Sequence, residues 1–174
     1  FLEHLNGDFG MALWYRERRL LLLALDPFGV KPLYFAVADN AVWFASSLRA
    51  MLLYPVISTT IDPLGYSEYL TFQHTISPRT LLADVSRLPA GHYAVYQDGG
   101  FSMHQYWDLH FPDEATKLQD EATHVEQFRE AFARSIALRS ADQERIGVFL
   151  SGGMDSSSLV GMLAAQGYAG IHTY

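Results

Sequence analysis

Apolar runs separated by short polar turns fill the first hundred residues of the chain. The first pair of runs is Gly10–Tyr15 and Leu20–Leu25, with a charged turn at 16–19 between them. Two further pairs follow around turns of the same kind: 32–37 with 41–45, and 91–96 with 101–107. Runs dense in aromatic and β-branched residues around such turns are typical of β-hairpins. Because several runs are apolar on both faces, we expect sheets covered on both sides, as in a sandwich.

Two short helices are predicted between the second and third hairpins. Residues 47–54 are expected to form the first, which ends before Pro55. Asp62 is a favoured N-cap residue, and Pro63 suits the first turn of a second helix that runs towards Phe72. We expect both helices to be scaffold.

The composition changes near residue 108, where an acidic stretch with few apolar residues begins. We interpret 109–120 as a linker. Beyond it, apolar residues recur at spacings of three and four, which predicts an amphipathic helix. These residues are Val125, Phe128, Phe132 and Ile136. Thr123 and Glu126 are available as a capping box for this helix.

The last thirty residues predict the opening of a parallel α/β sheet. A compact apolar strand at 146–150 is followed by a glycine-containing turn and a helical stretch from about 156 to 166. A second strand is expected at 170–174. Strand, turn, helix and strand in this order are typical of parallel sheets. Since the last strand opens and nothing follows it, we expect the chain to be a piece of a longer protein.

Composition and charge exclude several classes of function. Twelve Lys and Arg against nineteen Asp and Glu give a net charge of −7, which argues against a nucleic-acid or anionic-membrane binder. The chain has no cysteine, so disulfides, cysteine-ligated metals and a cysteine nucleophile are excluded within it. Its seven histidines show no metal-ligand spacing. No signal peptide is visible, and the run 20–25 is far below the ~20 residues of a membrane span. We expect a soluble, cytoplasmic protein.

The sharpest chemical signal is the sequence LSGGMDSS at 150–157, where the buried strand ends and a helix begins. Small residues there let backbone N–H groups close around an anion, and a helix N-terminus adds donors and partial positive charge. Ser151 and Ser156 supply hydroxyl donors. Asp155 can hold the magnesium ion that accompanies a pyrophosphate group. The alternative is a plain strand-to-helix turn in which Asp155 only charges the first turn of the helix.

Other phosphate-binding loops do not fit this stretch. The Lys of the Walker A pattern is missing, and so is the G-x-G-x-x-G of dinucleotide-binding folds. The stretch 151–156 instead resembles the SGGxDS pyrophosphate-binding loop of the ATP pyrophosphatase superfamily. Enzymes of that superfamily split ATP between its α- and β-phosphates.

The resemblance extends over almost the whole chain. The segment 26–35, DPFGVKPLYF, is similar to the RDxxGxxPLYY segment of asparagine synthetases. The segment 44–51, FASSLRAM, resembles their FASExKAL, and LPAGH at 88–92 with Tyr106-Trp107 resembles LPPGH…YW. The segment 5–14 is similar to a late strand of class II glutamine amidotransferase domains. Together these motifs resemble an internal fragment of a glutamine-hydrolysing asparagine synthetase.

This resemblance implies a fold and domain boundaries. Residues 1–108 would be the C-terminal portion of an Ntn-type glutamine amidotransferase β-sandwich, of the α+β class. Residues 109–120 would be the linker. Residues 121–174 would open an α/β ATP pyrophosphatase domain, with the first strand, loop and helix of its parallel sheet.

The resemblance also implies a reaction, with ATP and Mg²⁺ as cofactors and aspartate and glutamine as substrates. Aspartate is activated as an aspartyl-adenylate, and ammonia from glutamine converts it to asparagine, with release of AMP and pyrophosphate. The backbone of Leu150 would contact the nucleotide, and Asp155 would ligate the metal. The phosphate groups would lie against Ser151, Gly152, Gly153 and Ser156. Whether the protein forms a homodimer is left open by the resemblance.

The resemblance assigns fewer functional residues of this chain to the glutaminase reaction. The nucleophile of the family lies upstream of Phe1, so no catalytic residue is assigned in this chain, and the fragment alone is expected to be inactive. Leu25 stands where the family has Arg, and Ser47 replaces the Glu of its ASE motif. Two alternatives stay open. One is a paralogue that amidates another carboxylate, such as a β-lactam synthetase-like or polysaccharide-associated enzyme, and the other is an inactive truncated product.

Overall fold

The computed structural model describes residues 1–111, 120–141, 143 and 145–174. The chain divides into two compact units, Phe1–Phe111 and Pro112–Tyr174, and each is described by itself. Most of the predicted linker at 109–120 lies outside the described residues. None of the helices in the described ranges is both long enough and apolar enough to cross a membrane.

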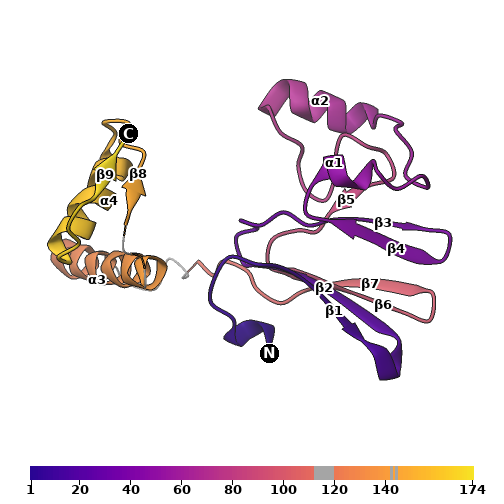
Figure 1. The fold of residues 1–174 in the computed structure, drawn as a ribbon, viewed down its shortest axis with the longest axis horizontal. Coiled ribbons are helices and arrows are strands. Elements are labelled where there is room, and N and C mark those ends of the chain that lie inside the picture. Colours follow the sequence, from indigo (N-terminus) through magenta and orange to yellow (C-terminus); the bar gives the residue numbers. More distant parts are fainter. Residues whose placement is uncertain (112–119, 142, 144) are drawn as a thin grey trace. The chain divides into compact units, whose positions relative to one another are not determined.

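The first unit contains a four-stranded antiparallel sheet made of two of the predicted hairpins (Figure 1). Its strand order is β1-β2-β6-β7. The bounds are β1 Gly10–Tyr15, β2 Leu20–Leu25, β6 His92–Gln97 and β7 Gly100–Gln105. Short 3-10 helices occur at Leu2–His4 and, in the β1–β2 turn, at Arg16–Arg18. The predicted pairing of these runs is confirmed.

A second antiparallel sheet, of order β4-β3-β5, shares a core with the first. It consists of β3 Tyr34–Ala38, β4 Ala41–Ala45 and β5 Ser86–Arg87. One buried cluster draws side chains from both sheets and from the loops beside them: Leu23, Leu25, Leu33, Phe35, Leu88 and Ala94. Phe35 of one sheet stacks on Phe101 of the other with ring centroids 5.0 Å apart. The two sheets therefore pack face to face, as the apolar pattern predicts.

Helices α1 and α2 lie on the side of the second sheet (Figure 1). α1 is only Leu48–Met51, shorter than the predicted 47–54, and Ser47 Oγ accepts a 3.2 Å hydrogen bond from the Ala50 N–H at its start. α2 is Pro63–Phe72, capped by Asp62 as predicted. A second buried cluster lies here: Ala36, Met51, Ile57, Leu82 and Val85.

The side chains of strand β1 are more exposed than expected for a sheet that is covered on both sides. Leu13, Trp14 and Tyr15 are 46%, 57% and 47% exposed. β1 is an edge strand whose only partner within the described residues is β2, so its side chains lack the neighbours that cover β2. An apolar run fits a central strand and an edge strand equally well, which is why the sequence misplaces it.

The second unit has the predicted order of helix, strand, helix and parallel strand. It consists of α3 Glu121–Ser140, β8 Gly147–Val148, α4 Met154–Ala165 and β9 His172–Thr173. Ile136, Val148 and Leu163 form its buried centre, so both helices contribute to one core with the strand β8. β8 is shorter than the predicted 146–150 because only Gly147 and Val148 pair with β9.

The predicted capping box of α3 is wrong. The N-cap is Asp120, whose Oδ1 accepts a 3.0 Å hydrogen bond from the Thr123 N–H and whose Oδ2 accepts a 2.8 Å bond from the Thr123 hydroxyl. These two bonds lower the pKa of Asp120 below its ordinary value. The helix therefore starts before Thr123, which lies inside its first turn.

Candidate nucleotide-binding loop

The loop between β8 and α4 begins at a fixed strand end. The Leu150 N–H donates a 2.9 Å hydrogen bond to the Tyr174 carbonyl, just beyond β9, and the Tyr174 N–H donates a 3.1 Å bond to the Val148 carbonyl. This ladder aligns the carboxyl ends of the two parallel strands. The Leu150 N–H is therefore engaged in this pairing.

Glycine backbone geometry turns the chain from the strand into the helix. Gly152 has φ +80°, in the left-handed region that favours glycine, and no other atom lies within 4 Å of the place its Cβ would occupy. Gly153 is the N-cap of α4 and brings no side chain to cap it. The first backbone N–H groups of this twelve-residue helix are therefore left open to a ligand, and the helix dipole favours an anion there.

The two serine hydroxyls of the motif meet across the loop. Ser151 Oγ lies 3.2 Å from Ser156 Oγ, although the residues are five positions apart. The Ser156 hydroxyl also donates a 3.2 Å hydrogen bond to the Gly153 carbonyl, and the Gly153 N–H lies 3.4 Å from Ser151 Oγ. The structure thus brings Ser151, Gly153 and Ser156 together, and it places hydroxyl and N–H donors around one helix end.

Asp155 is exposed in the first turn of α4, beside this donor-rich end. The described ranges hold no group of three or more His, Cys, Asp or Glu residues that could cage a metal. A single carboxylate next to a helix N-terminus that no side chain caps nevertheless fits Mg²⁺, which is held in proteins by one or two carboxylates together with substrate phosphates and water. The donor set therefore suits a magnesium–phosphate pair rather than an all-protein metal cage.

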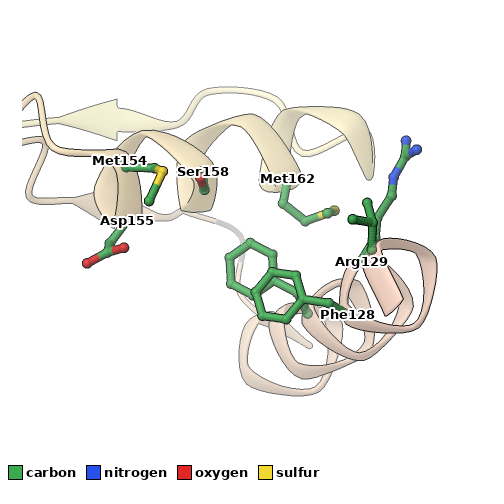
Figure 2. A pocket seen from close by; sticks show the side chains of 8 residues that line it. Phe128, Arg129, Met154, Asp155, Ser158 and Met162 are labelled. Carbon is green, nitrogen blue, oxygen red and sulfur yellow. The ribbon is translucent and has the colours of Figure 1, made fainter. Parts of the chain in front are cut away.

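An apolar groove between α3 and α4 reaches Asp155 (Figure 2). It has a volume of about 700 Å³. Its walls are mainly apolar side chains of the two helices: Val125, Phe128, Phe132, Met154 and Met162. Phe128 and Phe132 stack with centroids 5.9 Å apart. The α4 side of this groove is absent from the sequence-based prediction, although Met154, Ser158 and Met162 recur every four residues and so lie on one helix face.

Comparison with known proteins decides the family. Residues 1–107 match the family model described as a glutamine amidotransferase domain, and residues 127–174 match the model described as asparagine synthase. The chain belongs to the asparagine synthetase family. The loop at 150–156 lies inside the part that matches the asparagine synthase model.

The individual relatives of the chain are distant in sequence. The chain is 28% identical to asparagine synthetase [glutamine-hydrolyzing] 3 of Bacillus subtilis, over 99% of this chain and 28% of the relative. It is 32% identical to asparagine synthetase [glutamine-hydrolyzing] 1 of the same organism, over 90% of this chain and 24% of the relative. Amidase chry2 of Gibberella zeae is 31% identical over 94% of this chain and 24% of the relative. The chain thus spans about a quarter of the length of these relatives.

The first departure from the asparagine synthetase pattern, Leu25, lies in the core. Leu25 is completely buried at the end of β2, where a guanidinium would have no water. Its carbonyl accepts a 2.7 Å hydrogen bond from the Tyr106 hydroxyl. Burial, together with the negative charge of Asp26, raises the pKa of Tyr106.

The second departure, Ser47, has a structural use of its own. Its hydroxyl caps α1, so a short polar side chain serves where the family has Glu.

The aspartate that the family shares with this chain, Asp26, is 1% exposed and accepts three backbone hydrogen bonds of 3.0–3.2 Å from the loop at 28–31. The motif segment 26–35 is therefore held in place without the two family residues.

Proposed function

We propose that this protein is an ATP-dependent carbon–nitrogen ligase of the asparagine synthase (glutamine-hydrolysing) type. It would convert aspartate to asparagine with glutamine-derived ammonia. The observation that carries the proposal is the uncapped N-terminus of α4 with two serine hydroxyls and a carboxylate around it. The family match over the same residues supports it.

Each residue of the loop has a task in this proposal. The Leu150 backbone contacts the nucleotide through its carbonyl, because its N–H is already bonded to Tyr174. Ser151, Gly152, Gly153 and Ser156 bind the pyrophosphate portion of ATP through hydroxyl and backbone donors. The strand end and the helix hold these donors close together, so only a rotation of the hydroxyl groups is needed for them to face developing negative charge.

Asp155 would hold Mg²⁺ through its carboxylate. The ion would supply positive charge that offsets the negative charge of the leaving pyrophosphate. The β-carboxylate of the substrate aspartate attacks the α-phosphate of ATP. Pyrophosphate is released, and the aspartyl-adenylate that forms is then attacked by ammonia.

The proposal assigns residues 1–108 to the amidotransferase domain, 109–120 to a linker and 121–174 to the start of the synthetase domain. No residue of this chain is proposed as the glutaminase nucleophile, and the 174-residue chain by itself is proposed to be inactive. The substrates are aspartate, glutamine and ATP. The proposed location is the cytoplasm, without nucleic-acid or membrane partners, and with a homodimer as the assembly to test.

A second candidate is amidation of a different carboxylate by the same loop chemistry. Two relatives named as amidases, chry2 of Gibberella zeae and chyE of Penicillium rubens, are 31% and 30% identical over 94% of this chain. Their similarity to this chain is as high as that of the asparagine synthetases. ATP–pyrophosphate exchange that depends on a carboxylic acid other than aspartate would favour this candidate.

Asp155→Ala in the full-length protein tests the metal role. Aspartate-dependent ATP–pyrophosphate exchange should fall by about 100-fold or more, because the pyrophosphate loses its metal-held position. Any glutaminase activity should remain largely intact. Glu121→Ala is the matched control, since Glu121 is also an exposed acid in the first turn of a helix but lies on α3.

The two variants separate a binding role from a helix-charge effect. Glu121→Ala should exchange pyrophosphate at the wild-type rate. If Asp155→Ala retains exchange, Asp155 does not hold the metal, and if both variants lose it equally, the effect is structural.

A further inference from the structure

Arg87, on the short strand β5, is a half-buried cation without an acidic partner among the described residues. One of its terminal nitrogens, Nη2, donates a 3.3 Å hydrogen bond to the Gly29 carbonyl. In the part of the chain that the structure describes, both ion pairs belong to Arg79, which contacts Asp62 at 3.1 Å and Glu68 at 2.8 Å. A guanidinium group has five N–H donors, so those of Arg87 that do not bond to Gly29 are available to an anion.

Arg87 lines a cavity of about 230 Å³ in the first unit. Its walls come from β3, α1, α2, β5 and the segments between α2 and β5, which lie together in Figure 1. The lining residues include Tyr34, Tyr69, His74, Thr75 and Arg87, together with Leu48 and Leu81. No acidic residue is among them. The chain has a net charge of −7, whereas the lining of this cavity contains the cation Arg87 and no acid.

Several polar groups of this cavity have no partner within the described part of the chain. The hydroxyls of Tyr34, Tyr69 and Thr75 take part in no side-chain hydrogen bond within the described ranges. His74 Nδ1 lies 2.8 Å from the Phe72 carbonyl, which leaves its Nε2 available. Thr80 is different, because its hydroxyl already bonds to Leu82 and Val85 and serves the structure.

We propose that this cavity binds a small oxyanion, a carboxylate or phosphate group, with Arg87 as its cation. The guanidinium would face the anion with the nitrogens not used by Gly29, and the hydroxyls of Tyr34, Tyr69 and Thr75 would donate to it. Charge-assisted bonds of this kind are the strong ones, and the planar guanidinium fits both groups. This site consists of other residues than the loop at 150–156, and the proposal does not depend on the proposed ligase activity.

Titration with succinate and, separately, with inorganic phosphate tests the proposal on the purified protein. The readout is the amide chemical shift of Thr75, Thr80 and Arg87 in NMR spectra, which distinguishes this cavity from the loop at 151–156. At least one of the two anions should give saturable shifts below about 20 mM. Which anion saturates identifies the ligand as a carboxylate or a phosphate.

Three variants make the test specific. Arg87→Gln should weaken the binding by about 10-fold or more, because a charged donor is lost. Tyr69→Phe keeps the fold contacts of Arg87, removes one hydroxyl and should weaken binding by about 3- to 10-fold. Arg49→Gln removes the same charge from α1, outside the cavity, and should leave the affinity unchanged.

Two results would overturn the proposal. One is the absence of saturable shifts with either anion. The other is binding that Tyr69→Phe and a folded Arg87→Gln leave as tight as in the wild type. If Arg87→Gln fails to fold, the affinity of Tyr69→Phe decides alone.

Discussion

The structure predicts that Gly65→Ala in α2 lowers the stability of the protein, although helix propensity alone predicts a higher stability. Ala is the better helix former by about 1 kcal/mol, so propensity alone predicts a gain in stability. Gly65, however, is buried, and a Cβ there would lie closer to the backbone carbonyl oxygen of Thr80 than real Cβ atoms come. Helix α2 therefore packs with its backbone directly against the segment at Thr80.

The expected size of the effect follows from what can move. Thr80 is 2% exposed, and its hydroxyl bonds to Leu82 and Val85, so the carbonyl cannot shift without breaking a buried network. Overpacking of this kind costs typically about 1–3 kcal/mol, and more when the contact is backbone. After the gain in propensity, we expect Gly65→Ala to lower the free energy of unfolding by about 2 kcal/mol.

Urea denaturation followed by circular dichroism measures this effect, with Gly161→Ala as the matched control. Gly161 lies inside α4, and nothing surrounds the place of its Cβ within 4 Å, so this substitution should stabilise its helix by up to about 1 kcal/mol. If Gly65→Ala is as stable as the wild type, α2 does not pack as described. A shift of both variants in the same direction would contradict this packing as well.

Three further predictions concern single residues. Asp26→Ala should destabilise the protein by about 3 kcal/mol, because three backbone N–H groups lose their acceptor; a loss below about 1 kcal/mol in urea denaturation would contradict this. Gly152→Ala should raise the KM for ATP in pyrophosphate exchange, because φ +80° strains any other residue by about 1–2 kcal/mol; an unchanged KM would refute it. The folded-state pKa of Asp120 is lowered, so its stabilisation of α3 is present above the unfolded pKa and fades as pH falls through the folded one. Acid titration by circular dichroism should show this loss in the wild type but not in Asp120→Ala.

Local signals predicted most of the fold. The hairpins followed from apolar runs around turn residues, and Asp62-Pro63 placed the start of α2 correctly, because each of these features depends on a few adjacent residues. The cap of α3 was misplaced because Asp120 and Thr123 are both capping residues, and the apolar period locates a helix end only to about one turn. Which face a neighbour covers is not a local property, so the exposure of β1 could not be read from its sequence.

The same distinction holds for the sites. The loop at 150–156 is contiguous, so its motif could be found before its geometry was known. The Arg87 cavity gathers residues from 34 to 87 around a single cation, and no spacing in the sequence announces it. Its signal is a lining without acidic residues, which only the three-dimensional arrangement displays.

The products of ATP cleavage test the central claim most directly. The full-length protein should be incubated with ATP, Mg²⁺, aspartate and glutamine, and its phosphorus-containing products should be followed by ³¹P NMR. A loop that binds pyrophosphate as a leaving group predicts AMP and pyrophosphate in equal amounts. Release of ADP and inorganic phosphate instead would contradict the role assigned to residues 150–156.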